Sequence, residues 1–225
     1  MTRDWRPLRG SDWEPSLKGR LPDGFWADLS VFLDREADHG FVPASDRIFA
    51  ALLRTECKDT KVVIVGQDPY PIDGDADGFA FSVPRGRRKP GSLVNIHREL
   101  LSDGFGPIPD HGCLEEWADN GVLLLNTALT TRKGCRRSHR RIWRPFTRAI
   151  IDIVDEADGA AFVLWGRDAQ TLHRRLVFSR DRVVATAHPS RLSARKGFFE
   201  SHPFVRANVM LEDLKKEPID WTLHE

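Results

Sequence analysis

The chain has 225 residues, of which 40% are hydrophobic and 30% charged, a composition that excludes a disordered chain and favours one globular domain. No stretch reaches the roughly 18 uninterrupted apolar residues that a membrane-spanning helix requires, so we expect no membrane association. The formal net charge of +1 conceals three dense basic runs, at 85–89, 132–141 and 191–196. Segregated charge can present a cationic face to phosphates, although each run taken alone is more often a solvated loop.

The cysteine pattern bears on the compartment in which the protein works. Cys57, Cys113 and Cys135 form no CxxC pair and lie at no zinc-ligand spacing from a histidine. They are therefore expected to be free thiols in a reducing compartment. The first residues contain no apolar segment of the kind found in secretion signals, so we expect a cytoplasmic protein.

Four short apolar runs, at 61–65, 122–125, 161–165 and 182–186, predict strands that are covered on both faces. Three stretches between or after them show helical spacing of apolar residues, and Ser92 is the expected N-cap of the first. The three predicted stripes are Leu93, Val94, Ile96, Leu100 and Leu101; Phe146, Ala149, Ile150, Ile153, Val154 and Ala157; and Phe204, Ala207, Leu211 and Leu214.

Strands that alternate with helices predict parallel crossover connections. We therefore expect a three-layer α/β/α fold, with a central four-stranded, mostly parallel sheet flanked by helices. A single domain should span residues 1–225, and the sequence says little about its N-terminal segment, residues 1–25. Ligands of such sheets bind outside the carboxyl ends of the strands, so functional residues should follow the strands directly.

Two of the strand ends carry side chains capable of chemistry. After the first strand, Gly66-Gln67-Asp68-Pro69-Tyr70-Pro71 presents a carboxylate, a phenol and an amide on a loop stiffened by two prolines. The alternative is an ordinary Asp-Pro turn in which Asp68 caps the next segment. After the second strand, Asn126 offers a donor and an acceptor on one planar group, unless its amide satisfies the local backbone.

The other two strand ends are more ambiguous. Gly166-Arg167-Asp168 follows the third strand and could offer backbone N–H groups to an anion, or could be a plain turn into a helix. His188-Pro189-Ser190 follows the fourth strand, where His188 is a candidate electrophile, base or ligand, or a structural histidine. No metal-ligand spacing accompanies His188, so we expect no metal site.

Several motifs together resemble one known family, the family 1 uracil-DNA glycosylases. The resemblance runs in order from about Trp26 to Trp221 and is highly specific because the blocks succeed one another at compatible spacing. The blocks are Gly66-Gln67-Asp68-Pro69-Tyr70, Phe79-Ala80-Phe81-Ser82-Val83, Gly121 to Thr127, Leu164-Trp165-Gly166, His188 to Ser193, Gly197-Phe198-Phe199 and Pro218-Ile219-Asp220-Trp221.

The resemblance implies an enzyme that flips uracil out of single- or double-stranded DNA and hydrolyses its N-glycosidic bond, without metal or cofactor. In this role Asp68 activates the attacking water and stabilises the sugar cation, and His188 stabilises the departing uracil anion. Gln67 supports the loop near uracil O2. Tyr70 excludes the methyl group of thymine, Phe81 stacks on the base, and Asn126 reads its N3–H and O4 edge.

The resemblance also implies a DNA-binding edge. Ser92, Gly166 and Ser190 correspond to phosphate-contacting positions, and Leu192 corresponds to the side chain that fills the vacated stack. Two further positions of this edge depart from the family pattern: Arg167 replaces a common serine, and Arg191 replaces a common proline. A charged contact at Arg167 should steepen the salt dependence of binding.

The expected partner is uracil-containing DNA, and proteinaceous inhibitors of such enzymes are possible further partners. We expect the protein to be a monomer. Three alternatives remain at this point. A glycosylase of broader base choice conflicts with Tyr70 and Asn126, and a non-catalytic DNA-binding module conflicts with the presence of both Asp68 and His188. A nucleotide-binding α/β protein would need a GxGxxG or GxxxxGK[ST] loop after the first strand, which the chain lacks.

Overall fold

The computed structural model describes residues 8–172, 174 and 176–225. Residues 1–7, which belong to the N-terminal segment that the sequence leaves open, lie outside the described residues. Four parallel strands form the central sheet in the order β3-β2-β5-β6. They are β2 (Val62–Gly66), β3 (Val122–Asn126), β5 (Ala161–Trp165) and β6 (Val183–Thr186).

The four predicted strands are thus confirmed to within one residue at each end. Every residue of β2, β3 and β5 is buried, as continuous apolar runs predict for strands covered on both faces. The edge strand β6 is partly exposed. In the register between β2 and β3, Gly66 lies opposite Asn126, so these two strands end at the same level.

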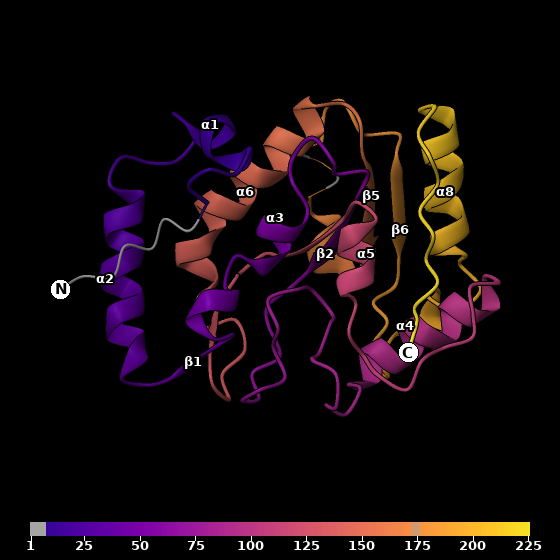
Figure 1. Cartoon of the computed structure of the whole chain (residues 1–225), viewed down its shortest axis with the longest axis horizontal. Helices are drawn as coiled ribbons and strands as arrows, with labels where there is room; N and C mark the ends of the chain where they lie inside the picture. The colour runs from indigo at the N-terminus through magenta and orange to yellow at the C-terminus, as the bar shows by residue number, and fades with distance from the viewer. Residues whose placement is uncertain (1–7, 173, 175) are drawn as a thin grey trace.

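The helices form the outer layers, and Figure 1 shows α6 and α8 on opposite sides of the strands. The predicted helices correspond to α4 (Gly91–Ser102), α6 (Arg140–Glu156) and α8 (Pro203–Asp213). The remaining elements are α1 (Trp13–Leu17), α2 (Phe25–Ala37), β1 (Phe41–Val42), η1 (Ser45–Arg47), α3 (Ala50–Arg54), α5 (Glu115–Asp119), β4 (Thr131–Arg132), α7 (Arg167–Gln170) and η3 (Ala194–Lys196). The predicted three-layer α/β/α architecture is confirmed.

The prediction of Ser92 as an N-cap was wrong. Helix α4 begins at Gly91, its N-cap is Pro90, and no side chain caps it. Pro90 has the extended backbone of an N-cap residue, with φ fixed by its ring, so the helix starts two residues earlier than predicted. Ser92 therefore lies inside the first turn, where its hydroxyl is available to other partners.

The predicted apolar stripes were also too wide. In α4, Leu93, Ile96 and Leu100 are fully buried, whereas Val94 and Leu101 are 39% and 57% exposed. Val94 and Leu101 are seven residues apart and share a second face of the helix, which points to solvent. Ala157 lies beyond the end of α6 and is exposed, because the helix ends at Glu156.

The described part of the N-terminal segment packs against the core. Trp13 of α1 is fully buried, and its Nε1–H donates to the carbonyl oxygens of Leu52 (3.0 Å) and Thr55 (3.1 Å). The buried apolar cluster of the core runs from Leu8 to Leu223. Among the described residues, no helix has both the length and the apolar character needed to cross a bilayer.

Candidate active site

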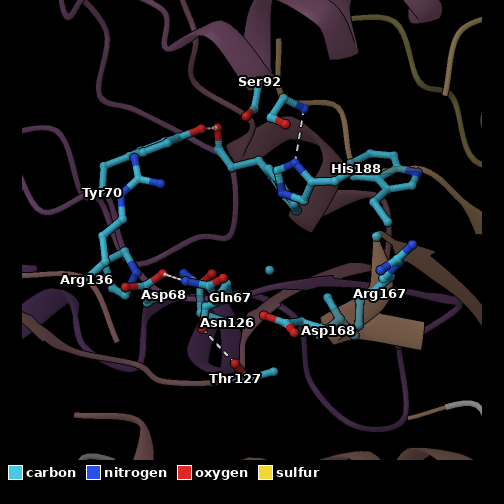
Figure 2. Close-up of a pocket in the computed structure, with 18 of the residues that line it drawn as sticks. Gln67, Asp68, Tyr70, Ser92, Asn126, Thr127, Arg136, Arg167, Asp168 and His188 are labelled. Atoms are coloured by element: carbon cyan, nitrogen blue, oxygen red, sulfur yellow. Dashed lines mark hydrogen bonds between the residues drawn. The ribbon is translucent and has the colours of Figure 1, made fainter. Parts of the chain in front are cut away.

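A cavity of about 410 Å³ opens at the carboxyl ends of the strands (Figure 2). Loops that follow β2, β3, β5 and β6 all contribute to its wall. Eleven of the twelve predicted site residues line it: Gln67, Asp68, Tyr70, Phe81, Ser92, Asn126, Gly166, Arg167, His188, Ser190 and Leu192. Arg191 does not line the cavity, and its side chain lies against Gly91 at the start of α4.

Both carboxylate oxygens of Asp68 accept hydrogen bonds. Oδ1 accepts from Nε2 of Gln67 at 2.7 Å, and Oδ2 accepts from the backbone N–H of Arg137 at 2.7 Å. The loop is also tied to the neighbouring strand end, since Thr127 Oγ1 donates to the carbonyl of Gln67 at 2.7 Å. Asp68 therefore does not cap its own turn; its carboxylate is held from two directions at the edge of the cavity.

Tyr70 and Phe81 form one aromatic side of the cavity. The hydroxyl of Tyr70 donates to the carbonyl of Phe81 at 3.2 Å, and burial raises the pKa of this phenol far above its usual range, so it remains protonated. Phe81 has a left-handed backbone (φ 68°), and its ring packs edge-on against Trp165 with centroids 5.2 Å apart. The ring is thereby fixed beside His188, 5.9 Å away.

Asn126 occupies the inner end of the cavity and is 5% exposed. Gly66 makes room for it, because a Cβ atom at residue 66 would lie 2.2 Å from Asn126 Oδ1. Among the described residues, no protein group forms a side-chain hydrogen bond with the Asn126 amide. The amide is thus not used to satisfy the local backbone and can bind a ligand through its donor and its acceptor.

The hydrogen bonding of His188 fixes which of its ring nitrogens carries a proton. The backbone N–H of Ser190 donates to Nδ1 at 3.0 Å, so Nδ1 is an acceptor and the neutral ring carries its proton on Nε2. Burial, and secondly the positive charge of Arg136, lower the pKa of His188. Gly166, at φ 88°, allows the close approach of His188, whose Cβ would lie 2.8 Å from an added side chain.

Comparison with known proteins identifies the family. Residues 54–212 match the family model described as the uracil DNA glycosylase superfamily. The chain belongs to this superfamily. It is 43% identical over 221 residues to the uracil-DNA glycosylase of Bacillus licheniformis, an alignment that covers 97% of this chain and 98% of that protein. With the uracil-DNA glycosylase of Bacillus subtilis it shares 44% identity over 223 residues, covering 98% of this chain and 99% of that protein.

Solved structures of the superfamily share the fold. The crystal structure of mimivirus uracil-DNA glycosylase superposes with a TM-score of 0.82 at 28% identity, covering 96% of this chain and 83% of the other. A variant of the mimivirus enzyme in complex with UGI gives a TM-score of 0.85 at 28% identity, covering 94% of this chain and 87% of the other.

Several further residues line the cavity that were not predicted from the sequence. Arg136 comes from the turn between β4 and α6, Arg140 is the first residue of α6, and Asp168 comes from α7. The basic run at 132–141 was a visible signal for the two arginines, but nothing in its spacing indicated which of them face the cavity. Asp168 is paired with Arg137, whose guanidinium also donates to Gln67 Oε1 at 2.8 Å.

The acidic loop at 73–77 lies beside the catalytic candidate Asp68 in sequence, and its charges are compensated by nearby groups. Asp77 is buried and accepts a hydrogen bond of 2.5 Å from Ser82 Oγ. With other described residues the loop forms the ion pairs Asp73–Lys133 (2.9 Å) and Asp75–Arg87 (2.6 Å). These carboxylates therefore tie the loop to basic neighbours and brace the segment that carries Phe81.

One group of potential metal ligands exists among the described residues, formed by Glu99, Asp103 and His202. Glu99 accepts backbone N–H groups of residues 200–202, and Asp103 accepts those of Phe204 and Val205. Glu99 of α4 and Asp103, which directly follows this helix, thus hold the first turn of α8 and the residues before it, and these bonds account for their position. None of the three residues lines the cavity.

Proposed function

We propose that the chain removes uracil from single- or double-stranded DNA by hydrolysing the N-glycosidic bond, the first step of base excision repair, without a metal or cofactor. The observation that carries this proposal is the joint placement of Asp68 and His188 at one cavity, on different sides of it (Figure 2). Membership of the superfamily and the uracil-DNA glycosylase relatives from Bacillus support it.

Asp68 and His188 each stabilise one of the two charges that develop when the N-glycosidic bond breaks. A base inside a duplex cannot be reached, so the nucleotide must first be flipped into the cavity at a cost of a few kcal/mol. Bond cleavage then leaves positive charge on the sugar and negative charge on uracil. Asp68 stabilises the sugar cation and orients the attacking water, while the Nε2–H of neutral His188 donates to uracil O2. Preorganised groups of this kind are each worth about 10²–10³ in rate.

Base selection rests on the inner wall of the cavity. The free amide of Asn126 can accept from N3–H and donate to O4 of uracil, whereas cytosine presents the opposite pattern at these positions. Tyr70 stands where the methyl group of thymine would lie, and Phe81 stacks on the base. Gln67 supports the loop near O2, because its amide is already oriented by Asp68 and Arg137.

The DNA strand is bound at the outer edge of the cavity. Leu192 is 87% exposed, and an apolar side chain that projects freely is suited to fill the gap left by a flipped base. Ser92, Gly166 and Ser190 contribute hydroxyl and backbone N–H groups to phosphates, and Arg167 contributes a charge. Arg191 adds a second cation next to Leu192.

The cysteines bear on the location of the protein, and its relatives bear on its partners. The unpaired thiols Cys57, Cys113 and Cys135 support a reducing compartment, and we place the enzyme in the cytoplasm as a monomer. A single catalytic domain spanning residues 1–225 is part of the proposal. A proteinaceous inhibitor is a further partner in the proposal, and the complex of a mimivirus uracil-DNA glycosylase variant with UGI supports it.

An oligonucleotide with one deoxyuridine tests the function directly. After incubation with the protein in EDTA and treatment with alkali, strand scission at the uracil position is expected. Asp68→Asn should greatly reduce single-turnover cleavage while uracil-DNA binding is largely kept. A gel shift without scission by the unmodified protein would instead indicate a non-catalytic DNA-binding module.

A further inference from the structure

Three arginines at the mouth of the cavity have no ion pair with the described part of the chain. Arg136, Arg140 and Arg167 line the cavity, and within residues 8–172, 174 and 176–225 no carboxylate forms an ion pair with any of them. Several arginines elsewhere are paired with carboxylates. Examples are Arg20 with Glu156, Arg87 with Asp75, Arg132 with Glu36 and Arg182 with Asp158.

The carboxylates near this mouth are already occupied. Asp168, which also lines the cavity, is bound by the guanidinium of Arg137, and Asp68 accepts the backbone N–H of Arg137. Arg137 neutralises one of these two carboxylates. The charges of Arg136, Arg140 and Arg167 exceed the single remaining charge of Asp68, and an excess of positive charge attracts anions to this side of the molecule.

The three arginines flank the cavity rather than gathering at one point. Figure 2 shows Arg136 next to Tyr70 at the left of the cavity and Arg167 at the right, on the same side as His188. Arg140 is the first residue of helix α6, and Arg136 lies four residues before it, in the turn between β4 and α6. The charge of Arg136 acts inside the cavity as well, since it lowers the pKa of His188.

A DNA strand with one nucleotide flipped into this cavity must carry phosphates past both sides of the mouth. We propose that Arg136 and Arg140 form a phosphate-binding subsite for the DNA strand on the Tyr70 side, opposite Arg167. The inference rests on the proposed function, because the phosphates belong to the strand that delivers the uracil. It assigns DNA binding to the β4–α6 turn and identifies which members of the basic run make the contact.

The salt dependence of cleavage measures this contact. Each phosphate neutralised by a protein cation contributes a slope of about −0.7 to the logarithm of affinity against the logarithm of salt concentration for single strands. We expect Arg136→Gln and Arg140→Gln to make the slope of kcat/KM for single-stranded uracil-DNA shallower by about 0.7 each. At low salt, kcat/KM should fall about two- to fivefold.

Arg141→Gln is the matched control. Arg141 is exposed, carries the same charge and is adjacent to Arg140, but it does not line the cavity. Its variant should keep the salt slope of the unmodified enzyme. Arg136→Lys and Arg140→Lys should retain most of the slope, and an unchanged thermal unfolding midpoint shows that each variant is folded.

Neutral methylphosphonate linkages beside the deoxyuridine locate the contact. If an arginine binds one particular phosphate, neutralising that phosphate in the substrate should remove the effect of the glutamine variant, as in a double-mutant cycle. Equal slopes for Arg136→Gln, Arg140→Gln and the unmodified enzyme would overturn the inference. So would an equal change in Arg141→Gln. Failure of the proposed function is distinguishable from failure of this inference, because in the first case the unmodified protein would release no uracil at all.

Discussion

The backbone N–H of Arg137 donates a 2.7 Å hydrogen bond to Oδ2 of Asp68. Arg137 can do so because its backbone is left-handed (φ 64°), a conformation that is uncommon for residues other than glycine. Its guanidinium binds Gln67 Oε1 at 2.8 Å and also Asp168, and Gln67 in turn donates to Oδ1 of Asp68. Both oxygens of the carboxylate are therefore oriented, directly or through Gln67, by one residue of the β4–α6 turn.

Replacing Arg137 by alanine should loosen this arrangement without removing the backbone N–H. The amide of Gln67 loses the partner that fixes its orientation, a hydrogen bond from a charged guanidinium that solvent exposure weakens to about 0.5–1.5 kcal/mol. We expect single-turnover cleavage of uracil-DNA to slow by about two- to tenfold. Arg137→Lys should recover part of the rate. If Arg137→Ala cleaves at the unmodified rate, the orientation of Gln67 does not matter for catalysis.

Replacing Tyr70 by alanine should relax the exclusion of thymine. The ring of Tyr70 packs against the core, and its hydroxyl donates to the carbonyl of Phe81, so the ring fills the space next to C5 of the base. Without it, the cavity gains room next to C5 of the base. We expect weak but measurable release of thymine from DNA, assayed with a labelled thymine opposite a mismatch. Tyr70→Phe keeps the ring and should still reject thymine; thymine release by both variants, or by neither, would contradict the steric role.

The fold and much of the site could be predicted because the signals are local. Continuous apolar runs identify the strands, and the rule that parallel strands end at one edge brings Asp68, Asn126 and His188 together. The role of Arg137 could not be predicted, since it depends on a left-handed backbone and on a contact with Asp168 across 31 residues. The solvent-facing side of α4 was missed because Val94 is apolar, and spacing alone does not separate two neighbouring faces.

The activity should persist at a pH where an ordinary histidine is protonated. His188 must be neutral on Nδ1, and burial together with the charge of Arg136 lowers its pKa from the usual value of about 6.5. Asp168 acts in the opposite direction, but it is a smaller influence. We therefore expect the acid limb of kcat/KM that belongs to His188 to lie below pH 6.5, and to be absent in His188→Gln.

The variant Arg136→Gln tests whether the charge of Arg136 is one cause of the lowered pKa of His188. Removing the cation eliminates one of the two causes that lower the pKa of His188, so the acid limb should move to higher pH, while burial keeps it below the ordinary value. Arg141→Gln changes the net charge equally and should leave the limb in place. A limb that moves to lower pH in Arg136→Gln, or equally in both variants, would contradict the assignment.

A second histidine makes stability, rather than activity, depend on pH. His97 of α4 is 4% exposed, and neither ring nitrogen has a hydrogen-bond partner among the described residues. Burial lowers its pKa to about 4, with smaller contributions from the charges of Lys89 and His111. The unfolded chain binds a proton near pH 6.5, whereas the folded chain does so only near pH 4. Stability should therefore be lost as pH falls through this window, by up to about 3 kcal/mol at its lower end.

His97→Leu replaces the ring with an apolar side chain that cannot bind a proton. The free energy of unfolding, measured by urea denaturation from pH 7 to pH 4.5, should fall less steeply in this variant than in the unmodified protein. The substitution could raise or lower stability at pH 7 through packing, but packing does not depend on pH, so the comparison of slopes isolates the proton. The exposed His39→Leu serves as the control. Parallel pH profiles for His97→Leu and the unmodified protein would mean that His97 is protonated equally in the folded and unfolded chains.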